Sequence, residues 1–254
     1  MEPKAPQSPQ APSQEPLDLT EHGMAKGGQP QSTQRRCYFQ LLVFTHCTDT
    51  KSITDAIAAK GFDAVVYHNV NDPQGIGLLF MNENPAFFAK EVRSLLQSAP
   101  FAGLVFKPEM TMLGRTYALG RELDLEDWML HKFRRNALNP DYPWAVWYPL
   151  RRKPEFAALE RHEQGKILAE HGNLGRVYGD AGYAQDIRLN CFGIDTHDNE
   201  FVIGLVGPEL YPLSRLVQDM RKTQQTVKFI QQLGPFFVGY KVWQNGNVPP
   251  PSAT

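Results

Sequence analysis

A histidine and a tyrosine in the middle of the chain carry the side chains best suited to metal or redox chemistry. His171 could ligate a metal or a haem iron through its imidazole. It lies in no HExxH or CxxCH motif, so a helix end, where the dipole favours a cationic ring, is the alternative role. Tyr148 ends the aromatic run at 144–148, and a core tyrosine with a hydrogen-bonded hydroxyl is the commoner role for such a residue.

A short basic cluster follows this tyrosine directly. Arg151, Arg152 and Lys153 stand in series after Leu150. Guanidinium groups are the preferred partners of carboxylates, so the cluster could hold an acidic ligand. A solvated loop is the ordinary alternative.

Two further sets of polar residues share a face by their spacing. His131 and Arg134 lie one turn apart in a helix expected over 123–135. Asp186, Arg188 and Asn190 alternate with apolar residues, as on the polar face of a half-buried strand or the wall of a pocket.

The elements that must position these side chains occur twice in the same order. Each half of the chain is expected to read β-α-β-β-α-β, the ferredoxin-like order, which gives an α+β fold. In the second half, Pro154 and Glu155 open a helix that we expect to end at His171 and Gly172. The predicted division is a disordered Pro/Gln-rich tail at 1–35, halves at 36–122 and 123–244, and a second tail at 245–254.

Composition excludes several classes of partner. The formal net charge of −1 and the lack of a basic stripe argue against nucleic acid. The three cysteines, Cys37, Cys47 and Cys191, have neither metal-site nor disulfide-framework spacing. Without a signal pattern or a run long enough to span a bilayer, a cytoplasmic location is the default expectation.

Five segments, taken in order and spacing, resemble the chlorite dismutase superfamily and, within it, the coproheme decarboxylases of haem synthesis. They are WYPLRR at 147–152, AEHGNLGRVYG at 169–179, CFGID at 191–195, LVQDMR at 216–221 and GPFFVG at 234–239. The resemblance implies that the two halves form a dimeric α+β barrel with the haem site in the C-terminal half. It also implies a homo-oligomer, usually a pentamer.

The resemblance assigns roles to individual residues. It implies that His171 is the proximal iron ligand, that Tyr148 is the radical-forming tyrosine, and that His131 is the distal base. Arg134, Arg151 and Arg152 are the candidates for holding porphyrin propionates. The distal position above the iron falls on Asp186, or on Arg188 if the alignment shifts by two residues.

The implied activity is oxidative decarboxylation of iron coproporphyrin III (coproheme), both substrate and cofactor, to haem b with hydrogen peroxide. A haem-binding or haem-transfer protein with weak peroxidase activity and a haem-free scaffold are the alternatives. Two departures from the family pattern stand out. Asp186 at the distal position argues against chlorite chemistry, and the carboxylate expected behind the proximal histidine falls on Gln224 or Gln225.

Overall fold

Eight antiparallel strands close into a barrel. The computed structural model describes residues 17–248 and 250–251. The strands run in the order β10-β9-β7-β3-β5-β4-β12-β8, and pairing of β8 with β10 completes the circle. Their bounds are β3 Tyr38–Thr45, β4 Ala64–Asn69, β5 Ile76–Asn82, β7 Met112–Arg115, β8 Trp144–Arg152, β9 Gln185–Asn190, β10 Phe201–Gly207 and β12 Phe237–Asn245.

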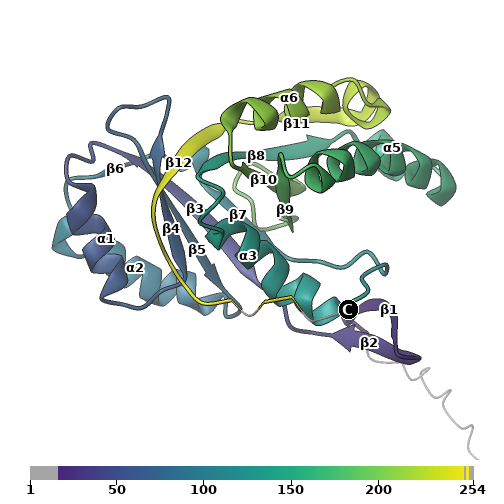
Figure 1. Cartoon of the computed structure of the whole chain (residues 1–254), viewed down its shortest axis with the longest axis horizontal. Helices are drawn as coiled ribbons and strands as arrows, with labels where there is room; N and C mark the ends of the chain where they lie inside the picture. Colours follow the sequence, from purple (N-terminus) through teal and green to yellow (C-terminus); the bar gives the residue numbers. More distant parts are fainter. Residues whose placement is uncertain (1–16, 249, 252–254) are drawn as a thin grey trace, which may run out of the picture.

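Each half of the barrel has the ferredoxin-like strand order, which confirms the predicted fold class. In the first half β7, β3, β5 and β4 are neighbours, and in the second half β9, β10, β8 and β12 are. Helices α1 (Thr50–Ala58) and α2 (Arg93–Leu96) accompany the first half, and α5 (Arg161–Asp180) and α6 (Leu210–Met220) the second (Figure 1). Two short strands, β6 (Val105–Phe106) and β11 (Ile230–Leu233), join the edges of β3 and β8.

Strands such as β4 and β5 are buried on both faces, which explains their nearly continuous apolar sequences. Inward-facing side chains such as Phe39, Tyr67 and Trp147 fill the barrel. On the outside, α1 and α2 cover one apolar layer that includes Ile53, and α5 and α6 cover another that includes Tyr148. The region between the halves contains a π-helical turn, Asp127–His131, that continues into α3 (Lys132–Leu138).

The helix that carries His171 is longer than the sequence indicated. A short helix, α4 (Pro154–Ala157), begins at Pro154 as expected, and α5 then runs from Arg161 to Asp180. The prediction of a helix end at His171 and Gly172 is therefore wrong. Packing of Leu174 and Tyr178 against the sheet extends the helix past its glycines, because tertiary contacts outweigh their weak intrinsic propensity.

Residues 17–35 also differ from the prediction of a disordered tail. Strands β1 (Glu21–Lys26) and β2 (Gln29–Thr33) form a hairpin around Gly27 and Gly28, both with positive φ. The hairpin contains few apolar residues, so hydrophobicity did not predict it, although Gly-Gly is a hairpin signal. The remainder of the predicted tail, residues 1–16, lies outside the described residues.

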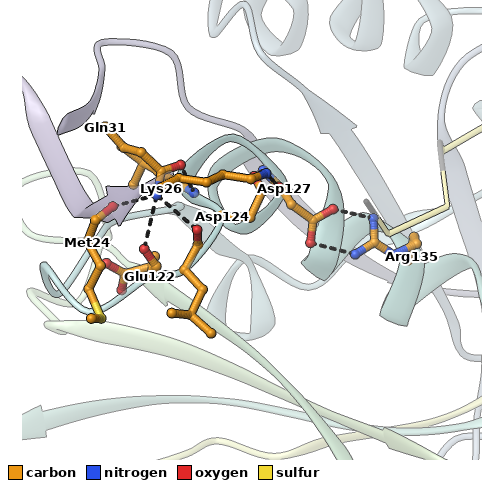
Figure 2. Close-up of polar contacts among 9 residues, drawn as sticks. Met24, Lys26, Gln31, Glu122, Asp124, Asp127 and Arg135 are labelled. Atoms are coloured by element: carbon orange, nitrogen blue, oxygen red, sulfur yellow. Dashed lines mark hydrogen bonds and ion pairs between the residues drawn. The ribbon is translucent and has the colours of Figure 1, made fainter. Parts of the chain in front are cut away.

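Polar contacts attach this hairpin to the segment that precedes α3 (Figure 2). Lys26 Nζ lies 2.5 Å from Asp124 Oδ2, and the Met24 amide donates to the Glu122 carbonyl at 2.9 Å. The Gln31 side chain accepts from the Leu125 amide at 3.0 Å and also donates to backbone carbonyls of this segment.

At the other end of the chain, β12 extends to Asn245, and no helix or strand follows among the described residues of the predicted C-terminal tail. Among the described residues, none of the helices has the length and apolar character needed to cross a membrane.

Candidate functional site

Three side chains form a row across the second half of the barrel. Ile203 in β10 pairs with Tyr148 in β8 on one side and with Arg188 in β9 on the other. Directly paired residues share a face of a sheet, and this is the outer face, because Tyr148 and Ile203 belong to the layer covered by α5 and α6. Asp186 lies on the same face, in the adjacent row with Leu205.

Tyr148 is held between apolar neighbours. Its side chain is 7% exposed, and its ring stacks on Phe236 with centroids 4.7 Å apart. Burial, with a further contribution from the charge of Asp186, raises the pKa of the phenol strongly. Tyr148 is therefore a protonated phenol at neutral pH.

His171 lies near the middle of α5, on the face that packs against the sheet. Its Nδ1 is 3.4 Å from the hydroxyl oxygen of Thr223. That hydroxyl donates its single proton to the Met220 carbonyl at 2.8 Å, so it is available to His171 as an acceptor. Nδ1 then carries the ring proton, and Nε2 keeps a lone pair that can bind a metal.

The electrostatics around His171 favour the same neutral form. Burial lowers the pKa of the ring, and the charge of Arg188 lowers it further, against smaller opposing effects of Asp186 and Glu170. A neutral imidazole is the form that ligates metals. The helix-end alternative for His171 does not apply, since α5 continues for nine residues beyond it to Asp180.

The expected glutamine contact behind His171 is also corrected. The atom beside Nδ1 belongs to Thr223 and not to Gln224 or Gln225. The backbone amide of Gln224 donates to Glu170 at 3.0 Å, and the side chain of Gln225 is buried. The turn after α6 brings Thr223 to the ring, because α6 ends at Met220.

Asp186 and Arg188 form an ion pair at the centre of the site. Arg188 Nε lies 2.6 Å from Asp186 Oδ2. Both charges act on the pKa of His171 and on that of Lys132, so these four groups lie within electrostatic reach of one another. The Arg188 guanidinium also lies 5.4 Å from the centre of the Trp128 ring.

The two arginines at the end of β8 have partners from the same chain. Arg152 donates to Glu200 at 2.6 Å, and its guanidinium packs over Phe201 at 4.8 Å from the ring centre. Phe201 belongs to the outer layer that contains Tyr148. Arg151 instead donates to the side chain of Gln232 at 3.1 Å.

The two residues expected to share a helix face have different surroundings. His131 ends the π-helical turn, and its Nδ1 is buried without a hydrogen-bond partner among the described residues. Arg134 forms an ion pair with Asp63 in the first half, and its Nη2 also donates to the Asn247 carbonyl at 3.4 Å. Since these contacts direct its guanidinium toward the first half of the barrel, we do not carry Arg134 forward as a ligand of the site.

Comparison with known protein families gives one match that includes the site. The sequence model of the family described as chlorite dismutase matches residues 92–242, more than half of the chain. The chain belongs to the chlorite dismutase family. Within this family, its site residues Tyr148, His171, Asp186 and Arg188 all fall inside the matched range.

Curated relatives in the chlorite dismutase family match a shorter stretch. A coproheme decarboxylase from Oceanobacillus iheyensis is 31% identical over 121 residues, covering 45% of this chain and 47% of that protein. A coproheme decarboxylase from Mycolicibacterium smegmatis is 29% identical over 96 residues, covering 37% and 38%. The chain thus spans less than half the length of the curated relatives it matches.

Solved structures of the chlorite dismutase fold align over most of the chain. A heme-binding protein from Thermus thermophilus superposes with a TM-score of 0.61 at 17% identity, covering 82% of this chain and 93% of the other. Chlorite dismutase from Candidatus Nitrospira defluvii, in complex with imidazole, gives a TM-score of 0.60 at 13% identity, covering 82% and 92%. At these identities the likeness shows the fold alone.

Sequence reasoning missed four residues of this candidate site. Thr223 and Phe236 contact His171 and Tyr148, and Trp128 and Lys132 lie beside Arg188 and Asp186. Phe236 lies in the GPFFVG segment, and Trp128 and Lys132 share the i, i+4 spacing of one helix face. Those signals could have indicated Phe236 and the Trp128–Lys132 pair, whereas Thr223 had no sequence signal.

Proposed function

We propose that this chain binds coproheme with His171 as the iron ligand and converts it to haem b with hydrogen peroxide. The observation that carries the proposal is the arrangement of His171. Its Nε2 lone pair is available, because Nδ1 is directed at Thr223, and Arg188 and Asp186 of the Tyr148 layer are within electrostatic reach. Family membership and the two curated relatives named coproheme decarboxylase support the choice of substrate.

The residues present fit an iron porphyrin. A neutral imidazole with a hydrogen-bonded Nδ1 is an established type of haem ligand. The buried Nδ1 of His131 lacks a partner among residues 17–248 and 250–251, as expected for a polar atom awaiting a ligand or solvent. The cations Arg152 and Arg188 are suited to porphyrin carboxylates, since each guanidinium has more donors than its carboxylate partner uses.

Each side chain then has a distinct role. The iron porphyrin supplies the oxidising chemistry when it is bound. His131 accepts a proton from hydrogen peroxide as a general base. Tyr148, a neutral phenol against Phe236, would give an electron to the bound oxidising group and its proton to solvent, and would then take a hydrogen atom from the β-carbon of a propionate. Arg152 and Arg188 hold carboxylates of the porphyrin, which fixes the orientation of the ring in the site.

The reaction balances with peroxide as the sole oxidant. A propionate carboxylate loses carbon dioxide, one proton and two electrons to leave a vinyl group. One hydrogen peroxide takes up these two electrons, this proton and one further proton from solvent, and is reduced to two waters. Two such rounds convert coproheme to haem b. A homopentamer and a cytoplasmic location stay predictions of the resemblance and of the sequence.

Mass spectrometry of the porphyrin tests the proposal. The protein is loaded with ferric coproheme and treated with excess hydrogen peroxide. Successive loss of two carboxyl groups supports decarboxylation. Peroxide consumption with an unchanged or bleached porphyrin would instead indicate a haem-binding protein with weak peroxidase activity. An unchanged absorption spectrum after coproheme addition would indicate a haem-free scaffold.

A further inference from the structure

The helix beside β9 carries a cation, Lys132, that forms no ion pair with a carboxylate of the described residues. Lys132 begins α3, and its Nζ lies 4.3 Å from the centre of the Trp128 ring. The Trp128 indole is itself fixed, because its N–H donates to the Tyr117 carbonyl at 2.9 Å. The cation–π contact therefore holds the ammonium group in one place at the edge of the site.

Two carboxylates are close enough to influence Lys132, and each is already paired with an arginine. Asp127 receives two hydrogen bonds from Arg135, at 2.6 and 2.7 Å (Figure 2). Asp186 is paired with Arg188 at 2.6 Å. Within the described parts of the chain, no ion pair links Lys132 Nζ to a carboxylate oxygen within 4.0 Å.

A half-buried ammonium without a counter-ion is costly unless a ligand supplies the charge. Burial lowers the pKa of Lys132, whereas the charges of Asp186 and Asp127 oppose that shift. The formal charges of Lys132, Arg188 and Asp186 add up to +1. An anionic group of a bound molecule would remove this excess.

We propose that Lys132 binds a carboxylate of the porphyrin, and specifically a propionate that is not decarboxylated. This inference rests on the proposed function, which supplies a ligand with four propionates. Tyr148 and Arg188 are two strand spacings apart, about 10 Å at the spacing of neighbouring strands, with Ile203 between them.

Lys132 lies on the far side of this row from Tyr148. Its helix packs against β9. Trp128 donates a hydrogen bond to the segment after β7, and β7 is the next strand beyond β9 in the sheet. A carboxylate held there is out of reach of the Tyr148 phenol. The contact is therefore made with a side chain that coproheme and haem b share.

The test compares the affinity of both ferric porphyrins for the full chain and two variants. Lys132→Met keeps an unbranched side chain over Trp128 and removes the charge; Lys132→Arg keeps the charge. We expect Lys132→Met to raise the Kd of ferric coproheme and of ferric haem b by similar factors, about tenfold. We expect Lys132→Arg to restore most of the affinity. Lys60→Met, an exposed lysine in the first half, is the matched control and should change neither Kd.

Salt dependence and thermal melting separate a ligand contact from a structural role. Loss of a ligand carboxylate contact in Lys132→Met should reduce the slope of log Kd against log salt concentration. The melting temperature of the unliganded variant should not fall, because the variant loses an ammonium group that has no counter-ion without the ligand. Equal affinities for wild type and Lys132→Met would overturn the proposal and leave decarboxylation standing. A loss confined to coproheme, or accompanied by a fall in melting temperature, would also overturn it. A wild type that binds coproheme yet removes no carboxyl group under peroxide would reject the proposed function and leave the Lys132 contact intact.

Discussion

The Nδ1 atom of His171 lies 3.4 Å from the Oγ1 atom of Thr223. Thr223 belongs to the turn that follows α6. This contact sets the tautomer of the ring, since the hydroxyl proton is already donated to the Met220 carbonyl. The two helices that cover the outer face of the barrel thereby cooperate: α5 supplies the imidazole, and the end of α6 supplies its acceptor.

Removal of the hydroxyl should weaken iron binding. Thr223→Val keeps the branched shape and eliminates the acceptor of His171. Partners of metal-ligating histidines typically contribute about 10- to 100-fold to metal affinity, so we expect the Kd of ferric coproheme to rise by about tenfold. Absorption titration measures the change. Thr226→Val is the control, because Thr226 contacts Thr223 at 3.3 Å and His171 keeps its partner.

Replacement of the imidazole should remove the protein's ligand to the iron. His171→Ala is expected to remove the shift of the ferric Soret band on titration with coproheme. The variant should stay folded, since α5 is held by several other side chains such as Leu174 and Tyr178. A spectrum identical to that of wild type would show that another residue ligates the iron.

The stability of the protein without porphyrin should depend on the protonation of His171. The pKa of the buried ring is lowered from 6.5. The unfolded chain therefore takes up the proton first as the pH falls, so the free energy of unfolding decreases below about pH 6.5 and is unaffected by this residue above it. Urea unfolding of wild type and His171→Gln at pH 7.5 and 5.5 measures the effect. An equal pH dependence of the two proteins would show that the ring is not shielded in solution.

The hydroxyl of Tyr148 should be needed for decarboxylation and not for folding. Tyr148→Phe keeps the ring stacked on Phe236, and a hydroxyl hydrogen bond contributes only about 1 kcal/mol net to stability. We expect near wild-type coproheme binding, no comparable loss of carboxyl groups under peroxide, and bleaching of the porphyrin. Conversion to haem b at the wild-type rate would make Tyr148 a core residue only.

The hairpin β1–β2 should contribute to stability, contrary to the expectation of a dispensable tail. Deletion of residues 1–16 is expected to leave the melting temperature unchanged. Deletion through Thr33 should lower it by several degrees, because it removes the Lys26–Asp124 ion pair and the Gln31 contacts with the segment before α3. Lys26→Ala should account for only a small part of the loss, since the pair is exposed.

Chlorite should be decomposed poorly. Chlorite needs a positive group near the iron, whereas the proposed function assigns the guanidinium of Arg188 to a porphyrin carboxylate, and the neighbouring charge of Asp186 opposes a second anion. Measurement of oxygen evolution from chlorite checks this. Sustained evolution by wild type would show that Arg188 turns toward the iron, and Asp186→Asn would then be expected to accelerate it further.

The sequence by itself determined the order of the elements and the type of fold. Alternation and apolar runs in segments such as 38–45 and 76–82 indicated the strands, since side-chain burial imposes its period on the chain. Spacing placed Asp186 and Arg188 on one face of β9, and the five motifs pointed to the family and to Tyr148 and His171. These inferences depend on local periodicity, which a sequence displays directly.

Only the tertiary structure decided the partners of those residues. Pairing of β8 with β10 sets the register that aligns Tyr148 with Arg188, and the end of α6 brings Thr223, not Gln224 or Gln225, to His171. Likewise, Arg134 faces Asp63 in the first half, and polar contacts with residues 122–125 fix the hairpin. Such contacts join residues far apart in the sequence. They result from barrel closure and helix packing. The free energy of folding that stabilises them is distributed over many side chains, so no local sequence pattern predicts them.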